Sequence, residues 1–172
     1  MNLSPRLSIV VISNRDWQSH GPLVESLLQQ NNLSDVEILW VNHFQSAPTS
    51  FFEFPGTLIS RHLPSPVPHH GNRSRDFGAL QSRGEWILFL DDDTSLIEPK
   101  QLGEILAIAQ SATSAEVVRG RYRNQPRTWA ARIYSKIQSD FVASQGFLVG
   151  GAVLIKKSAY LRCLPFSLDI AY

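Results

Sequence analysis

The sequence contains a single cysteine, Cys163, so no disulfide can form within the chain, and a reducing compartment is expected. The 16 lysine and arginine residues nearly balance the 15 acids, and a net charge of +1 gives no reason to expect a nucleic-acid partner. The longest apolar run, residues 147–155, is far below the roughly 18 residues that a transmembrane segment needs. We therefore expect one globular domain over residues 1–172, in the cytoplasm or at the inner face of the membrane.

The sequence does contain a run of three carboxylates, Asp91, Asp92 and Asp93, directly after the apolar segment Trp86–Leu90. No basic residue follows before Lys100. Two unit charges about 4 Å apart repel by roughly 4 kcal/mol at an effective dielectric constant of about 20. The run is therefore either a solvated polar turn, in which Asp93 or Thr94 caps the next structure, or the binding site of a cation.

Apolar, β-branched segments alternate with helical patterns, which predicts an α/β fold with a mostly parallel sheet and helices on both faces. The residue patterns place strands at 7–13, 36–42, 57–62, 86–90, 116–122 and 146–155, and helices after Pro22, over 72–83, after Pro99, and over 128–141 and 158–163. Gly84 is expected to end the second helix in the left-handed conformation. Ligands of such sheets bind beyond the carboxyl ends of the strands, which predicts Ser13, Asn42 and Asp91 at one edge.

This predicted placement favours a cation over a mere turn. Oxygen ligands suit a hard ion, Mg²⁺ or Mn²⁺. A calcium-binding loop would need glycine at its sixth position, where Leu96 stands. Because Mg²⁺ held by one or two carboxylates usually shares its coordination shell with phosphates, the expected ligand is a metal-bound diphosphate.

Three segments resemble the family-two glycosyltransferases of the GT-A fold: "LSIVVISNRD", "NRSRDFGALQSRGEWILFLDDDT" and "GGAVLIKKSAYLR". The resemblance implies a Rossmann-like domain that transfers a sugar, with inversion, from a UDP- or GDP-type nucleotide sugar to a glycan or lipid-linked acceptor in polysaccharide biosynthesis. It also implies that the acids form the Asp-x-Asp motif, which binds the metal and the ribose-diphosphate. Asp93 would then be the principal metal ligand, Asp91 would contact the metal or the ribose, and Asp92 would be the variable middle residue of the donor site.

Other site residues follow from the same resemblance. Arg75 would balance the charge of the donor, and the glycine pair Gly150 and Gly151 would lie near the sugar and the acceptor. Ser13 and Asn14 stand where the family usually has Pro-Thr-Tyr-Asn. Asn42 stands where an acid usually meets the nucleobase, and its amide can still form hydrogen bonds with a base edge.

The resemblance also places the catalytic base beyond this chain. The segment "LPFSLDIAY" resembles the Phe-Asp-Glu-like segment of the family, so Asp169 matches an acid that precedes the base. We expect the base after Tyr172, in a C-terminal part of the domain that the sequence lacks. This chain alone is then expected to bind the donor and transfer sugar slowly or not at all, and its apolar surface could be covered by a second copy in a homo-oligomer.

Three further interpretations remain open. Arg119, Arg121 and Arg123 would project from one strand face, either as a surface for an anionic acceptor or as a solvated edge strand. A non-catalytic nucleotide-sugar-binding module is the main alternative function. A phosphohydrolase with an aspartyl nucleophile is another, although that chemistry needs the acidic strand to lead the fold and an acidic pair later in the chain.

Overall fold

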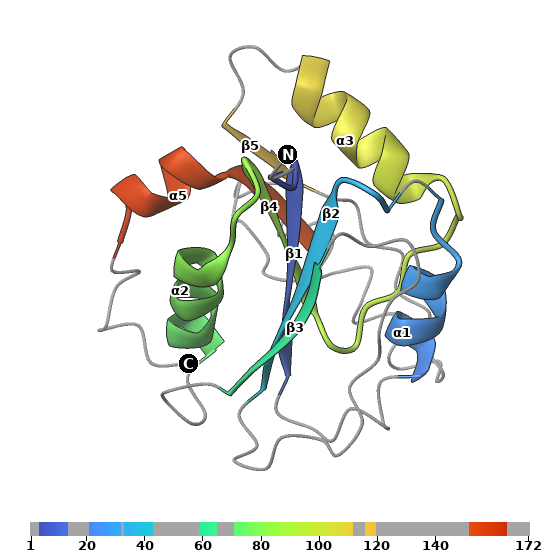
Figure 1. The fold of residues 1–172 in the computed structure, drawn as a ribbon, viewed down its shortest axis with the longest axis horizontal. Helices are drawn as coiled ribbons and strands as arrows, with labels where there is room; N and C mark the ends of the chain where they lie inside the picture. The colour runs from blue at the N-terminus through green and yellow to red at the C-terminus, as the bar shows by residue number, and fades with distance from the viewer. Residues whose placement is uncertain are drawn as a thin grey trace, which may run out of the picture.

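The computed structural model describes residues 4–13, 21–31, 33–42, 59–64, 71–111, 116–119 and 152–164. The elements in chain order are β1 (Leu7–Ser13), α1 (Gly21–Leu28), β2 (Val36–Asn42), β3 (Ile59–Pro64), α2 (Gly71–Gln81), β4 (Trp86–Asp91), α3 (Gln101–Ser111), β5 (Val117–Arg119), β6 (Ala152–Lys156) and α5 (Lys157–Arg162) (Figure 1).

The strands form one sheet in the order β3-β2-β1-β4-β6-β5. β3, β2, β1 and β4 are parallel, whereas β6 runs antiparallel to both β4 and β5. The predicted mostly parallel α/β sheet is confirmed.

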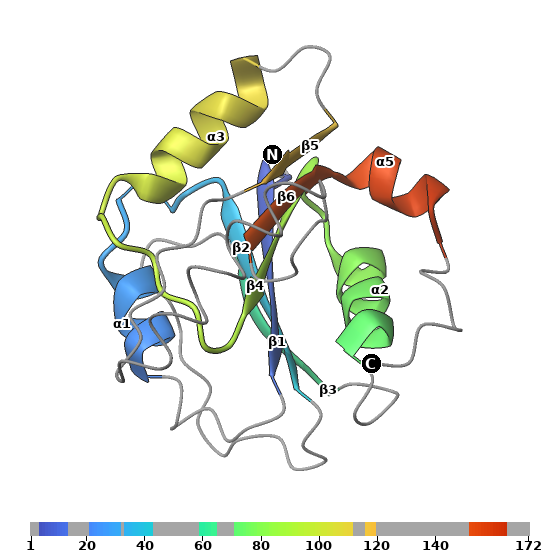
Figure 2. The same ribbon diagram turned by 180° about the vertical axis from the view of Figure 1, so that it is seen from behind.

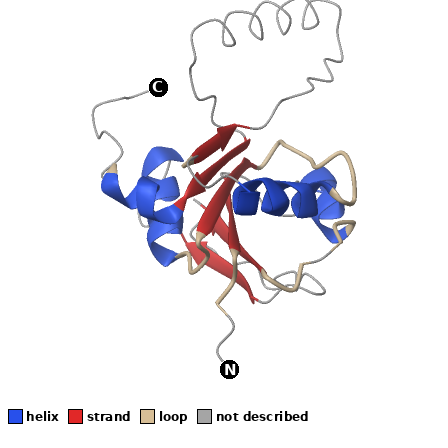
Figure 3. Ribbon diagram, turned by 90° about the horizontal axis from the view of Figure 1, so that it is seen from above, coloured by secondary structure: helices blue, strands red, loops and turns tan. Residues whose placement is uncertain are grey.

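Helices cover both faces of this sheet, as seen from the front, from behind and from above (Figures 1, 2 and 3). One apolar core lies between the sheet and the helices α1 and α3, and a second lies between the sheet and the helices α2 and α5. Every residue of β1 and β2 is buried. This burial on two faces explains why both strands read in the sequence as near-continuous apolar runs.

Gly78 allows α2 to lie directly against the sheet. A Cβ atom at this position would collide with the Val10 side chain and come within 3.1 Å of Val41 Cγ2. Both valines are fully buried, and a β-branched side chain in a packed core has little freedom to turn aside. Close contact between α2 and the sheet therefore requires glycine here.

We expect Gly78→Ala to lower the free energy of unfolding by about 1–3 kcal/mol, because it overpacks the interface between α2 and the sheet. The matched control is Gly103→Ala in α3, where an added Cβ meets no atom within 4 Å. Alanine is the better helix former, so the control should be more stable by about 0.5–1 kcal/mol. Urea titrations of the two variants should therefore shift in opposite directions, and shifts in the same direction would contradict this account.

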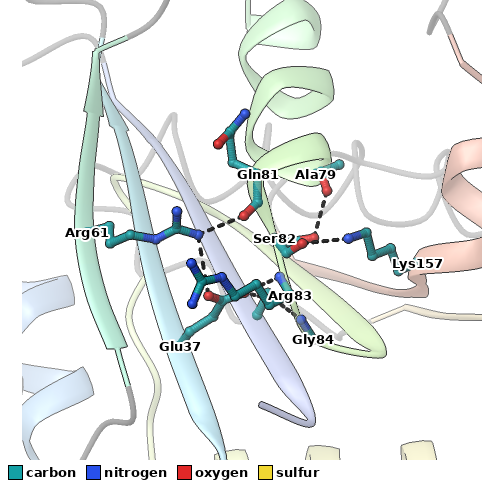
Figure 4. A network of polar contacts seen from close by, with 9 residues as sticks. Glu37, Arg61, Ala79, Gln81, Ser82, Arg83, Gly84 and Lys157 are labelled. Atoms are coloured by element: carbon teal, nitrogen blue, oxygen red, sulfur yellow. Dashed lines mark hydrogen bonds and ion pairs between the residues drawn. The ribbon is translucent and has the colours of Figure 1, made fainter. Parts of the chain in front are cut away.

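Gly84 serves a different purpose from the one that the sequence suggested. Its backbone is not left-handed, so the expectation of a left-handed helix end is wrong. Instead, a Cβ on Gly84 would lie 2.6 Å from the backbone nitrogen of Ser8, and the Gly84 N–H donates to the Ser8 hydroxyl at 2.8 Å. The position requires glycine because the turn between α2 and β4 passes against the backbone of β1 (Figure 4).

Element bounds differ from the predictions mainly at the periphery. β3 begins at Ile59 and ends at Pro64, two residues later at each end than predicted, and its place at the sheet edge tolerates the proline. The predicted helix over 128–141, Arg121 and Arg123 lie outside the described residues. Among the helices that the structure describes, none is long and apolar enough to cross a membrane.

Candidate functional site

Three neighbouring parallel strands end at the same edge of the sheet, and each brings a polar residue there. Ser13 of β1 pairs in register with Asn42 of β2, and Ile12 pairs with Asp91 of β4. Ser13 and Asn42 are almost fully buried, with 1% and 2% of their surfaces exposed. The predicted placement of these residues at one edge is confirmed, while their roles in donor binding stay a prediction.

The acidic run begins at the last residue of β4 and continues into a turn. The Thr94 N–H donates to the Asp91 carbonyl at 3.1 Å, and the Thr94 hydroxyl donates to the same oxygen at 2.6 Å. Asp91 and Asp92 are half-buried, whereas Asp93 is exposed. The polar turn weighed from the sequence is therefore present, closed by Thr94, and it presents Asp93 to solvent beyond the strand.

Arg75 reaches this edge from the first half of α2. Its Nη2 atom lies 2.6 Å from Asp91 Oδ1, and its Nη1 atom lies 3.5 Å from Asn72 Oδ1, one helical turn earlier. Their side chains are 22% exposed for Arg75 and 36% for Asp91, so the ion pair is partly shielded from water. The sequence pointed to Arg75 as a counter-charge for the donor, and the structure shows that it is paired with an acid of the motif.

The electrostatics of Asp91 are set by its position. Burial raises the pKa of Asp91 above its ordinary value, the Arg75 guanidinium opposes that rise, and the Asp93 and Asp92 carboxylates add to it. A raised carboxyl pKa makes a contribution to stability that is present at low pH and is lost as the pH rises through the pKa of the folded state. The ionised form that predominates at higher pH would be favoured by a further cation at this edge.

The residues at this edge fit a shared metal site better than a complete protein cage. Within the described ranges, no group of three or more His, Cys, Asp or Glu side chains is arranged to hold a metal ion. One oxygen of Asp91 already accepts a hydrogen bond from Arg75. The exposed Asp93 carboxylate is therefore the most accessible ligand for a metal ion. Mg²⁺ and Mn²⁺ accept one or two carboxylates when phosphates and water complete the shell. These carboxylate oxygens therefore suit Mg²⁺ or Mn²⁺ together with a phosphate ligand.

Some predicted site residues are not placed. Asn14, Gly150 and Gly151 lie outside the described residues, and so does Asp169. The predictions for them rest on the sequence alone.

The model of the glycosyl transferase family 2 matches residues 8–162, which is most of the chain. The chain belongs to glycosyl transferase family 2. Curated relatives of this family-two domain include the O-antigen biosynthesis protein RfbC of Myxococcus xanthus, 28% identical over 109 residues, and an uncharacterized glycosyltransferase of Haemophilus influenzae, 31% identical over 107 residues. The matches cover 62% and 60% of this chain but 8% and 34% of the relatives, so the chain spans only a part of their length.

Solved structures with the same fold include the mannosyltransferase PcManGT from Pyrobaculum calidifontis, in complex with GDP-Man and Mn²⁺, with a TM-score of 0.67 and 12% identity. Another is S. aureus TarS, with a TM-score of 0.61 and 17% identity. The matches cover 98% and 91% of this family-two domain and about half of each solved chain, 49% and 48% respectively. The GT-A fold expected from the sequence is confirmed.

Proposed function

We propose that this family-two domain binds a nucleotide-diphosphate sugar together with Mn²⁺ or Mg²⁺ and transfers the sugar, with inversion, to a hydroxyl group of a glycan or lipid-linked acceptor. The observation that carries the proposal is the arrangement at the carboxyl edge. Asp91 and the turn through Asp93 stand beside Ser13 and Asn42, and Arg75 adds a cation from α2. The carboxylates for a metal thus lie at one end of the edge, and the buried amide and hydroxyl groups expected on the nucleoside side lie at the other.

Each group has a task that its chemistry suits. The amide of Asn42 can donate and accept hydrogen bonds at a base edge. The Asp93 carboxylate, with support from Asp91, would hold the cation, and Arg75 keeps Asp91 in a fixed orientation. When bound, the cation would offset the negative charge that builds on the departing diphosphate. Holding donor and acceptor in line would reduce the entropic part of the barrier.

One solved structure with the same fold and one curated relative support the proposed ligands and pathway class. PcManGT, which shares the fold, was solved with GDP-Man and Mn²⁺, and RfbC is named for O-antigen biosynthesis. A guanine nucleotide sugar and a polysaccharide product are therefore the donor and product classes to test first, and the family resemblance of the sequence adds a uracil nucleotide sugar.

Calorimetric titration of the domain with GDP, UDP, ADP and CDP, each with Mn²⁺ or with EDTA, tests the proposal. We expect GDP or UDP to bind in the presence of Mn²⁺ and to lose most of the binding in EDTA. The matched monophosphate should bind more weakly, because it lacks the second phosphate that completes the metal shell. Failure of all four diphosphates to bind with Mn²⁺ would contradict the proposal. Donor binding without transfer to any acceptor would favour the alternative, a non-catalytic nucleotide-sugar-binding module, only in a protein that includes the expected general base.

A further inference from the structure

Tyr160 of α5 forms a buried polar contact with the helix that carries Arg75. Only 4% of the Tyr160 surface is exposed, and its hydroxyl donates to Asp76 Oδ1 at 2.8 Å. Asp76 directly follows Arg75 in α2. A buried tyrosine hydroxyl needs a hydrogen-bond partner, and here the partner is a side chain of α2 next to the candidate site.

The ring of Tyr160 contacts the strand that carries the acids. Its centroid lies 5.1 Å from that of Phe89, with the two planes tilted by 43°. Phe89 precedes Asp91 by two positions in β4, so both side chains point to the same face of the sheet. That face carries the apolar core beneath α2 and α5.

These contacts join β4, α2 and α5 to one another. Arg75 of α2 forms an ion pair with Asp91 of β4, and the next residue of α2, Asp76, accepts a hydrogen bond from Tyr160 of α5. The Tyr160 ring in turn contacts Phe89 of β4. Consecutive residues of a helix point about 100° apart, so α2 satisfies both polar contacts only over a narrow range of rotation about its axis. A rotation that breaks the contact with Tyr160 would also move the backbone of Arg75 relative to Asp91.

We propose that Tyr160 is a positioning residue of the donor site, which holds Arg75 against Asp91 by fixing the rotation of α2 through Asp76. This inference rests on the proposed function, since it assigns Tyr160 to the diphosphate end of that same site. Burial, followed by the hydrogen bond and the charge of Asp76, raises the pKa of Tyr160 well above its ordinary value, so the hydroxyl remains a donor at any working pH. Ionisation of the tyrosine therefore does not break this contact.

Tyr160→Phe tests the inference because it keeps the ring against Phe89 and removes only the hydroxyl. We expect the Mn²⁺-dependent affinity for GDP or UDP to fall about tenfold, which is the lower end of the range for partners that orient a metal ligand. Asp76→Ala also removes this hydrogen bond, through the half-buried acceptor, and should lower the affinity by at least as much. Ser158→Ala, which removes an exposed hydroxyl from the same helix, should leave the affinity unchanged.

A double-mutant cycle with Arg75→Met separates positioning from general stability. If Tyr160 acts through Arg75, then Tyr160→Phe causes no further loss of affinity once Arg75 is methionine. Equal losses in both backgrounds would show that Tyr160 affects the site only by stabilising the fold, and would overturn the inference. If Tyr160→Phe and Asp76→Ala bind the nucleotide as tightly as the wild type does, the role of Tyr160 is refuted, whereas the proposed function stands. Absence of binding by the wild type would overturn the proposed function and the inference together.

Discussion

Replacing Glu37 by leucine should lower the free energy of unfolding by about 3 kcal/mol or more, because it leaves one buried and two partly buried donors without their acceptor. Glu37 lies in β2 and is fully buried. Its Oε1 atom accepts from the Ser8 hydroxyl at 2.6 Å and from the backbone N–H of Arg83, and its Oε2 atom lies 3.5 Å from Arg61 Nη2 (Figure 4).

The same network fixes the end of α2. Arg61 Nη2 donates to the Gln81 carbonyl at 2.7 Å, and Lys157 Nζ donates to the Ser82 carbonyl. The Ser82 hydroxyl donates back to the Ala79 carbonyl at 2.7 Å. Through these contacts Glu37 and its partners join the turn between α2 and β4 to the strands β1, β2 and β3 and to α5 (Figure 4). Loss of the carboxylate therefore affects the carbonyl end of α2 and not β2 alone.

Thermal and urea unfolding measure the effect. For a domain of this size, a loss of about 3 kcal/mol corresponds to a fall in melting temperature of roughly 6–12 °C. Glu37→Gln keeps an oxygen acceptor and loses the charge, so its loss should be smaller. Arg61→Leu should cost less stability in the Glu37→Leu background than in the wild type, because the guanidinium has already lost its carboxylate and loses only its hydrogen bond to the Gln81 carbonyl.

Glu104→Ala is the matched control for the loss of an acid. Glu104 lies 3.2 Å from Lys100 in an exposed ion pair at helical spacing, and such pairs contribute little. The control should change the free energy of unfolding by no more than about 0.5 kcal/mol. A Glu37→Leu variant as stable as this control would refute the role assigned to the buried network.

The sequence predicts the central strands well because the residues within each strand carry the pattern that identifies it. β1 and β2 have the predicted bounds, since strands buried on both faces are apolar along most of their length. The carboxyl edge also follows from the sequence, because parallel strands joined by helices bring Ser13, Asn42 and Asp91 together whatever the details of the loops. The acidic run lies in one short segment and needs no knowledge of distant residues.

The contacts around the site and at the end of α2 are long-range, and no local sequence pattern indicates them. The Glu37 carboxylate in "VEILWVN" gives no hint of Ser8, and Tyr160 bonds to Asp76 across 84 positions of the sequence. Gly84 carried a local signal, but it favoured a helix end, whereas the true requirement is a close approach to Ser8. Which residues face each other across the sheet depends on how α2 and α5 pack, and periodicity cannot supply that.

Asp93→Ala should reduce the Mn²⁺-dependent affinity for GDP or UDP by about 100-fold or more, whereas Asp92→Asn should change it much less. Asp93 is the exposed acid of the turn, and Asp92 is half-buried, as is Asp91, which is already tied to Arg75. Residues that only orient metal ligands cost 10- to 100-fold in affinity when replaced, so loss of a direct ligand should exceed roughly the upper end of that range. Calorimetric titration with Mn²⁺ and each nucleotide measures the two affinities.

Stability must be measured beside binding, since only a change confined to binding assigns a metal to Asp93. An exposed turn residue should change the free energy of unfolding by no more than about 0.5 kcal/mol when replaced by alanine. If Thr94 and the Asp91 carbonyl hold the turn as they do here, Asp93→Ala leaves its backbone intact. The affinity loss would then come from the missing carboxylate itself. Full binding by both Asp93→Ala and Asp92→Asn would reduce the acidic run to a solvated turn, and the cation would have to bind elsewhere.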